Sequence, residues 1–165
     1  MADGGASSMI MLITALVISS MASVVLINSW AGIADVMDDQ GRKAEADSAT
    51  KVSLAGDTMN VDYVIVDTEI TLYFQNSGTT TLDSDSADMA IYVAGDAVTI
   101  TSTTVVSGAG EWYEGELLKV VGTHAGTAHA DDDEVIISLT VRSLPVNGMI
   151  GGDTLNEVVR LDVAP

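Results

Sequence analysis

The chain has 165 residues, which suits one folded domain with an accessory segment. It contains no cysteine, so disulfides, thiolate nucleophiles and cysteine-ligated metal sites are excluded. Its 6 lysines and arginines stand against 24 aspartates and glutamates, for a formal net charge of −18, and only Arg42 and Lys43 adjoin, so no groove for nucleic-acid phosphates is expected.

Aspartate outnumbers glutamate and lysine is scarce, a composition that resembles proteins of salt-loving archaea. Repulsion among so many carboxylates destabilises the folded protein at low salt. Salt at about 1 M weakens this repulsion, because it shortens the distance over which charges interact to about 3 Å. An acidic surface that serves solubility alone is the other interpretation.

The N-terminal part is uncharged from Gly4 to Ala34 and most apolar over residues 9–27, MIMLITALVISSMASVVLI. As a helix this run extends about 28 Å, close to the hydrocarbon thickness of a bilayer. Its only polar residues are serine and threonine, which can bond to carbonyls of their own helix. The side chains expected to contact lipid or neighbouring helices are Met9, Ile10, Leu12, Leu16, Val17, Met21, Val24, Leu26 and Trp30.

Two other interpretations of this run fit less well. A cleaved secretory signal has basic residues before a shorter apolar stretch, and no lysine or arginine precedes residue 9. A helix buried in a soluble core shows a polar face. A retained helix that spans a membrane or forms the core of a filament is therefore predicted.

The same helix is expected to run from about Ser7 to about Lys51, becoming amphipathic after Trp30, with Gly41 as a weak point. Residues 1–53 form the helical part and residues 54–165 an acidic β-domain. Arg42 and Lys43 lie too far from the apolar run to set its orientation by the positive-inside rule.

After residue 53 the hydrophobic period changes to two, as in strands. Short β-rich segments separated by turn residues predict a β-sandwich of Greek-key type, so the fold class is α+β. The core must rest mainly on valine, isoleucine, leucine and methionine, because the chain has a single phenylalanine. The predicted strands are residues 61–66, 69–76, 90–93, 97–101, 117–121, 135–141 and 158–163.

Three groups of residues could carry chemistry, and each has a simpler interpretation. His124 and His129 precede an acidic run at residues 131–134, which favours a solvated turn over a divalent-cation site. Residues 83–88 lack the glycine and glutamate of a calcium loop and are typical of Asx turns. Trp112 and Tyr113 could anchor a partner, but folding back on the core is favoured. No catalytic, cofactor or metal residue is predicted, and an enzyme is not expected.

Two segments resemble a known family. The polar start followed by Ser-Ser-Met-Ile-Met-Leu-Ile (residues 7–13) is similar to the beginning of the archaellum accessory protein FlaG, the sister of FlaF. Residues 70–83, ITLYFQNSGTTTLD, resemble a strand–turn–strand segment of that family. The helix followed by a cysteine-free β-domain is archaellin-like.

This resemblance implies a structural, non-enzymatic component of the archaeal motility machinery. It would be anchored in the archaeal membrane as a stator element. Its β-domain would lie outside, against the S-layer, a sister archaellum protein or further copies of itself. The alternative is a filament subunit, an archaellin or pilin, whose helices form the fibre core. Asp3-Gly4-Gly5 lacks the basic residue of a class III signal, which favours the anchor. A solute- or metal-binding surface protein is a third possibility.

Overall fold

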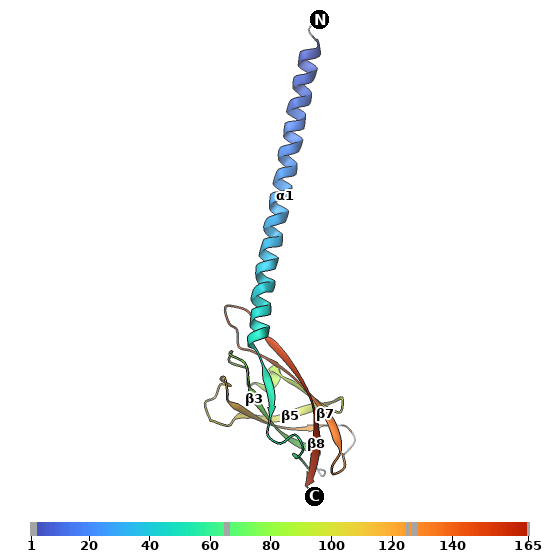
Figure 1. Ribbon diagram of the computed structural model, residues 1–165, viewed down its shortest axis with the longest axis vertical. Helices are drawn as coiled ribbons and strands as arrows, with labels where there is room; N and C mark the ends of the chain where they lie inside the picture. The colour runs from blue at the N-terminus through green and yellow to red at the C-terminus, as the bar shows by residue number, and fades with distance from the viewer. Residues whose placement is uncertain (1–2, 65–66, 125, 127–128, 165) are drawn as a thin grey trace. The chain divides into compact units, whose positions relative to one another are not determined.

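The computed structural model describes residues 3–64, 67–124, 126 and 129–164 (Figure 1). The chain forms two compact units, Met1–Gly41 and Arg42–Pro165. Helix α1 (Asp3–Ala49) makes up the described part of the first unit and begins the second. This confirms the prediction of one long N-terminal helix, which ends at Ala49 rather than Lys51.

The second unit is β-rich, as predicted, and its strands form a sheet that closes on itself. The strand order is β1-β3-β2-β8-β7-β4-β5-β6, and β3 also pairs with β6. The pairs are antiparallel apart from β2 with β8. The strands are β1 (Val52–Ala55), β2 (Val61–Val64), β3 (Glu69–Asn76), β4 (Ala90–Val93), β5 (Asp96–Val105), β6 (Leu117–His124), β7 (Glu134–Arg142) and β8 (Gly152–Ala164).

Side-chain alternation along the strands builds the core. In β7, Val135, Ile137, Leu139 and Val141 are buried while the residues between them face outward. The buried set is mostly aliphatic, as expected, but its three largest members are Trp112, Tyr63 and Phe74. A few large aromatic side chains therefore fill the space that the many valines leave.

The aromatic pair at residues 112–113 divides between core and surface. Trp112 is fully buried and its Nε1–H donates to the Glu116 carbonyl at 2.8 Å. Tyr113 is 46% exposed, and a hydrogen bond with Glu111 raises the pKa of its hydroxyl. The prediction that these aromatics fold back on the core is confirmed for Trp112 and wrong for Tyr113.

The predicted turns are present. Asp83 accepts from the amide of Asp85, and Asp85 accepts from the amide of Ala87, which caps the short 3-10 helix η1 (Ser86–Asp88). These are the expected Asx-type bonds. Asn147 and Gly148 both have positive φ in a two-residue hairpin closed by two bonds between Val146 and Met149.

Candidate functional site: the apolar helix and its base

The residues predicted to contact lipid or neighbouring helices all lie on α1, and their side chains are exposed. Their exposed fractions range from 45% for Val17 to 68% for Met9. Soluble monomeric proteins rarely expose so many large apolar side chains together. Such surfaces usually mark sites of contact with a membrane or with another protein. Each predicted residue is thus free to contact lipid or another helix: Met9, Ile10, Leu12, Leu16, Val17, Met21, Val24, Leu26 and Trp30.

Three hydroxyl groups within the apolar run bond to the helix itself, as the sequence predicted. Thr14 donates to the carbonyl of Ile10 at 2.8 Å, and Ser23 donates to that of Ser19 at 2.9 Å. Ser20 donates to the carbonyl of Val17 at 2.8 Å. These bonds lower the cost of placing hydroxyls in an apolar medium.

Within the described residues, one helix is long and apolar enough to cross a membrane. It covers Gly5–Ala49, its most apolar 18-residue window has a mean hydropathy of 2.6, and none of that window is buried. A helix satisfies its own backbone hydrogen bonds, so it can enter hydrocarbon without unpaired polar groups. Its length and composition therefore fit a helix that crosses a membrane.

The last two turns of α1 belong to the β-rich unit and are bonded to it on two sides; residues 42–49 are called the helix base. On the first side lies the segment between β7 and β8. Lys43 Nζ donates to the Ile150 carbonyl at 3.0 Å, and the Gly152 amide donates to Asp47 Oδ1 at 2.8 Å. Hydrogen bonds from Lys43 and Gly152 lower the pKa of the Asp47 carboxyl.

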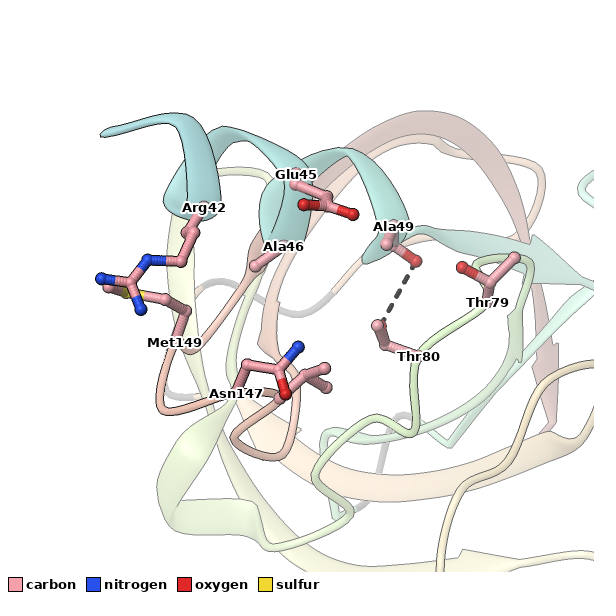
Figure 2. Close-up of a pocket in the computed structure, with 9 residues that line it drawn as sticks. Arg42, Glu45, Ala46, Ala49, Thr79, Thr80, Asn147 and Met149 are labelled. Carbon is pink, nitrogen blue, oxygen red and sulfur yellow. Dashed lines mark hydrogen bonds between the residues drawn. The ribbon is translucent and has the colours of Figure 1, made fainter. Parts of the chain in front are cut away.

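On the second side, the loop after β3 binds the C-terminal end of the helix. The Thr79 amide donates to the Ala49 carbonyl at 2.9 Å, and Thr80 Oγ1 lies 3.3 Å from the same oxygen (Figure 2). The amides of Ser77 and Gly78 both donate to the Lys51 carbonyl at 3.0 Å. Carbonyls that a helix end leaves unpaired are thus satisfied by the β-domain.

Asn76 holds this loop in place from beneath. Its fully buried side chain donates through Nδ2 to the carbonyls of Thr80 (2.8 Å) and Trp112 (3.0 Å). Its Oδ1 accepts from the Gly78 amide at 3.0 Å. One buried amide therefore fixes the loop that receives the helix.

Two glycines allow the close approach between helix base and β-domain. A Cβ on Gly78 would lie 2.3 Å from the Ala49 carbonyl oxygen, and one on Gly151 would lie 2.4 Å from that of Ala46. Neither distance is sterically possible. The sequence does not mark either glycine for this role, because a contact with a helix far away in the chain leaves no local signal.

A cleft of about 290 Å³ lies beside the helix base. Figure 2 shows Arg42 and Met149 at one end and Thr79 and Thr80 at the other. Val146 and Asn147 of the hairpin tip line it opposite the helix. Its lining holds no nucleophile–base pair, and its shape follows from the helix packing over the two loops.

The two histidines lie close together, and the structure corrects the prediction of a solvated turn for His124, which is buried, while most of the acidic run is exposed. His124 is 2% exposed, its Nε2 lies 3.0 Å from Tyr63 Oη, and its Nδ1 lies 3.1 Å from the Gly126 amide. The ring centroids of His124 and His129 are 5.1 Å apart. Burial, and then the neighbouring His129, lower the pKa of His124. Strand β6 carries His124 into the core, whereas Asp131, Asp132 and Glu134 are exposed.

Among the described residues, no group of three or more histidines, aspartates or glutamates is arranged to hold a metal ion. Two carboxylates after His129 instead accept from backbone amides: Asp133 from that of Ala130 in the same turn, and Asp131 from that of Val163 on β8. They stabilise the turn into β7.

The family model for archaeal-type flagellin matches residues 2–148, which include the helix, its base and most of the β-domain. The chain belongs to the archaeal-type flagellin family. The archaellin-like resemblance is therefore confirmed, and the chain is a structural component related to the archaellum. A flagellin-type family is structural, which supports a non-enzymatic role. Family and helix agree with a membrane-anchored or surface-exposed filament component.

No curated protein matches this member of the flagellin family. Solved structures to which the chain is similar include the secreted serine protease VesC from Vibrio cholerae, at 16% identity and a TM-score of 0.35 over 74% of this chain and 26% of that chain. The E. coli chaperone DraB matches at 16% identity and a TM-score of 0.35, over 70% of this chain and 55% of that chain. The chain thus spans about a quarter and about half of the lengths of these two proteins.

Proposed function

We propose that this flagellin-family protein is a membrane-anchored stator element of the archaellum. Its helix would hold the acidic β-domain on the outer side of the membrane, against the S-layer or a sister archaellum protein. The observation that carries this proposal is the apolar run of α1, residues 9–27, whose exposed side chains extend over about the hydrocarbon thickness of a bilayer. The proposal needs no catalytic group.

The helix base supports this role. A stator must pass force from its anchor to its outer domain, and a flexible linker would dissipate that force. Here the helix base is bonded through Lys43 and Asp47 to one loop, and through the Ala49 carbonyl to another. The helix base is therefore held within the β-rich unit by hydrogen bonds on two sides.

The second candidate function is that of a filament subunit whose helices form the fibre core. The family's description, archaeal-type flagellin, favours it. Ser19, Ser20, Ala22 and Ser23 also give one stretch of α1 a small surface on which helices can approach closely.

Deleting the gene in the host and scoring filaments and swimming separately tests both functions. A stator predicts normal filaments on cells that do not swim, restored by the wild-type gene. A filament subunit predicts loss of the filaments themselves. Normal swimming of the deletion strain would contradict both functions.

Intact-mass analysis of the protein from host membranes and from sheared filaments gives an independent comparison. The stator predicts the protein in the detergent-extracted membrane fraction with residues 1–5 retained. Recovery in sheared filaments without these residues would support the subunit.

A further inference from the structure

The hydrogen bonds of His124 fix where its proton lies. The Gly126 amide donates to Nδ1 at 3.1 Å, so Nδ1 is an acceptor and carries no proton. Nε2 then carries the proton of the neutral ring and donates it to Tyr63 Oη, 3.0 Å away. Since Tyr63 is fully buried and His124 is 2% exposed, both bonds are shielded from water. The structure therefore holds His124 as the neutral ring with its proton on Nε2.

Gly126 lies where this imidazole comes close to a carboxylate. A Cβ on Gly126 would lie 2.0 Å from Asp96 Oδ2 and 3.0 Å from His124 Nδ1, so these two side-chain atoms are no more than 5.0 Å apart. At such a separation a carboxylate favours the charged form of a histidine. In this structure, however, Nδ1 is bonded to the Gly126 amide and not to Asp96. One imidazole nitrogen therefore has two alternative partners, a backbone amide and a carboxylate.

Few titratable groups surround His124. Those that face it come from β2, from β5 and from the segment before β7: Tyr63, Asp96, His129 and, next to His129, Asp133. On β3, Glu69 pairs in register with Thr123, which places its side chain on the opposite face of the sheet from His124. Among the charged neighbours, Asp96 favours a proton on the ring and His129 disfavours one.

We propose that His124 and Asp96 form a pH-sensitive switch, which holds Gly126 at neutral pH and releases it in acid. In acid a proton from solvent binds Nδ1, so this nitrogen changes from acceptor to donor. It then faces the N–H of Gly126, a second donor, at 3.1 Å. The Gly126 amide moves away, and the charged ring donates to the Asp96 carboxylate in its place. At neutral pH the proton leaves Nδ1 and the bond to Gly126 re-forms.

The release is local, because the following residues are attached by bonds that do not titrate. The Asp132 amide donates to the Leu161 carbonyl, and the Leu161 amide donates to the Asp133 carbonyl, both at 3.0 Å. Acid should therefore detach Gly126 from β6 while residues 132 and 133 stay on β8. The switch lies within the β-domain, so it is independent of whether the helix is an anchor or a fibre core.

Nuclear magnetic resonance of the full, ¹⁵N-labelled chain in detergent and high salt tests the switch. At about pH 8 the His124 ring should carry a proton on Nε2 and none on Nδ1. As the pH is lowered to about 4.5, Nδ1 should gain a proton. At the same midpoint the Gly126 amide should lose its hydrogen bond, and its solvent exchange, corrected for the intrinsic effect of pH, should accelerate on the order of tenfold. The Leu139 amide in β7 should stay protected throughout.

Two substitutions should move this midpoint in opposite directions. Asp96→Asn removes the carboxylate that stabilises the charged ring, so the midpoint should shift to lower pH. His129→Gln removes the neighbour that disfavours the charged ring, so the midpoint should shift to higher pH. Glu114→Gln is the control for net charge, since Glu114 is exposed in a loop outside the strands, and it should leave the midpoint unchanged.

Four results would each overturn the switch. They are a proton on Nδ1 at neutral pH, different midpoints for His124 and Gly126, loss of protection of Leu139 at the same midpoint, and equal midpoints in the wild type and Asp96→Asn. A shift with Glu114→Gln as large as that with Asp96→Asn would also overturn it, because net charge would then explain the effect.

Discussion

Gly151 and Gly152 are neighbours with opposite steric surroundings. A Cβ on Gly151 would lie 2.2 Å from Thr50 Oγ1 and 2.4 Å from the Ala46 carbonyl oxygen. A Cβ on Gly152 would meet its nearest atom, the Val141 carbonyl oxygen, at 3.6 Å, an ordinary contact. The first glycine is thus required where the helix base meets the loop before β8, and the second is not.

Gly151→Ala should therefore destabilise the β-domain by about 1–3 kcal/mol, because the helix base must move away from the loop. Gly152→Ala is the matched control and should change the free energy of unfolding by less than about 1 kcal/mol. Denaturant unfolding followed by tryptophan fluorescence measures both. Equal effects of the two substitutions would contradict the close contact.

His124 predicts a loss of stability in mild acid. Its pKa is lowered by burial in the folded state, and its value in the unfolded chain is about 6.5. Below that pH the unfolded chain binds a proton that the folded chain does not accept. Stability should therefore fall as the pH drops through about 6.5 and continue to fall down to the folded-state pKa.

Thermal unfolding between pH 7.5 and pH 5 measures this loss. His124→Gln can keep a hydrogen bond to Tyr63 but does not titrate, so its unfolding temperature should depend less on pH than that of the wild type. An unchanged pH dependence would assign the acid sensitivity to other groups.

At the scale of elements, α1 was predictable because its signal is local. An uncharged run that continues into an alanine-rich, proline-free stretch leaves few alternatives to a helix. Strands β3 and β4 were predicted with the bounds that the structure has, since turn residues flank clean alternation.

The contacts of the helix base, and the first strand, were not predictable for a shared reason. Residues 52–55 pair with residues 73–76, and Asp47 bonds to Gly152, so their partners lie far away in the chain. Strand β8 was predicted only from residue 158. Its first half carries Asn156 and Glu157, which are poor strand formers, and pairing with β7 overrides this local preference.

The apolar run of α1 carries a prediction about partitioning. Leu16→Arg places a charge at the centre of the run, at a cost of about 2.5–3.5 kcal/mol for insertion into a membrane. The variant should shift from the membrane fraction to the soluble or aggregated fraction when host cells are fractionated. Met37→Arg, on the same helix beside acidic residues, is the control and should remain in the membrane fraction.

At the scale of the whole molecule, the acidic charge is spread unevenly and its cost depends on salt. Most outward-facing side chains on the strands are uncharged, but Asp62 on β2 lies beside Asp162 on β8 in the parallel register. Two like charges at neighbouring positions destabilise a sheet. The remaining charges add a long-range repulsion that favours the unfolded chain.

The unfolding temperature of the wild type should therefore rise between about 0.1 M and 2 M potassium chloride, as the screening length falls below about 10 Å. Asp62→Asn removes one member of the facing pair and should stabilise the protein by about 0.5 kcal/mol at low salt. At high salt this gain should disappear, because screening has already weakened the repulsion.

Glu114→Gln is the control: Glu114 is exposed in a loop outside the strands, so the substitution lowers the net charge equally without relieving a facing pair. If the two variants gain the same stability at low salt, the net charge governs the effect, and if neither gains, the acidic surface has no cost that salt must offset.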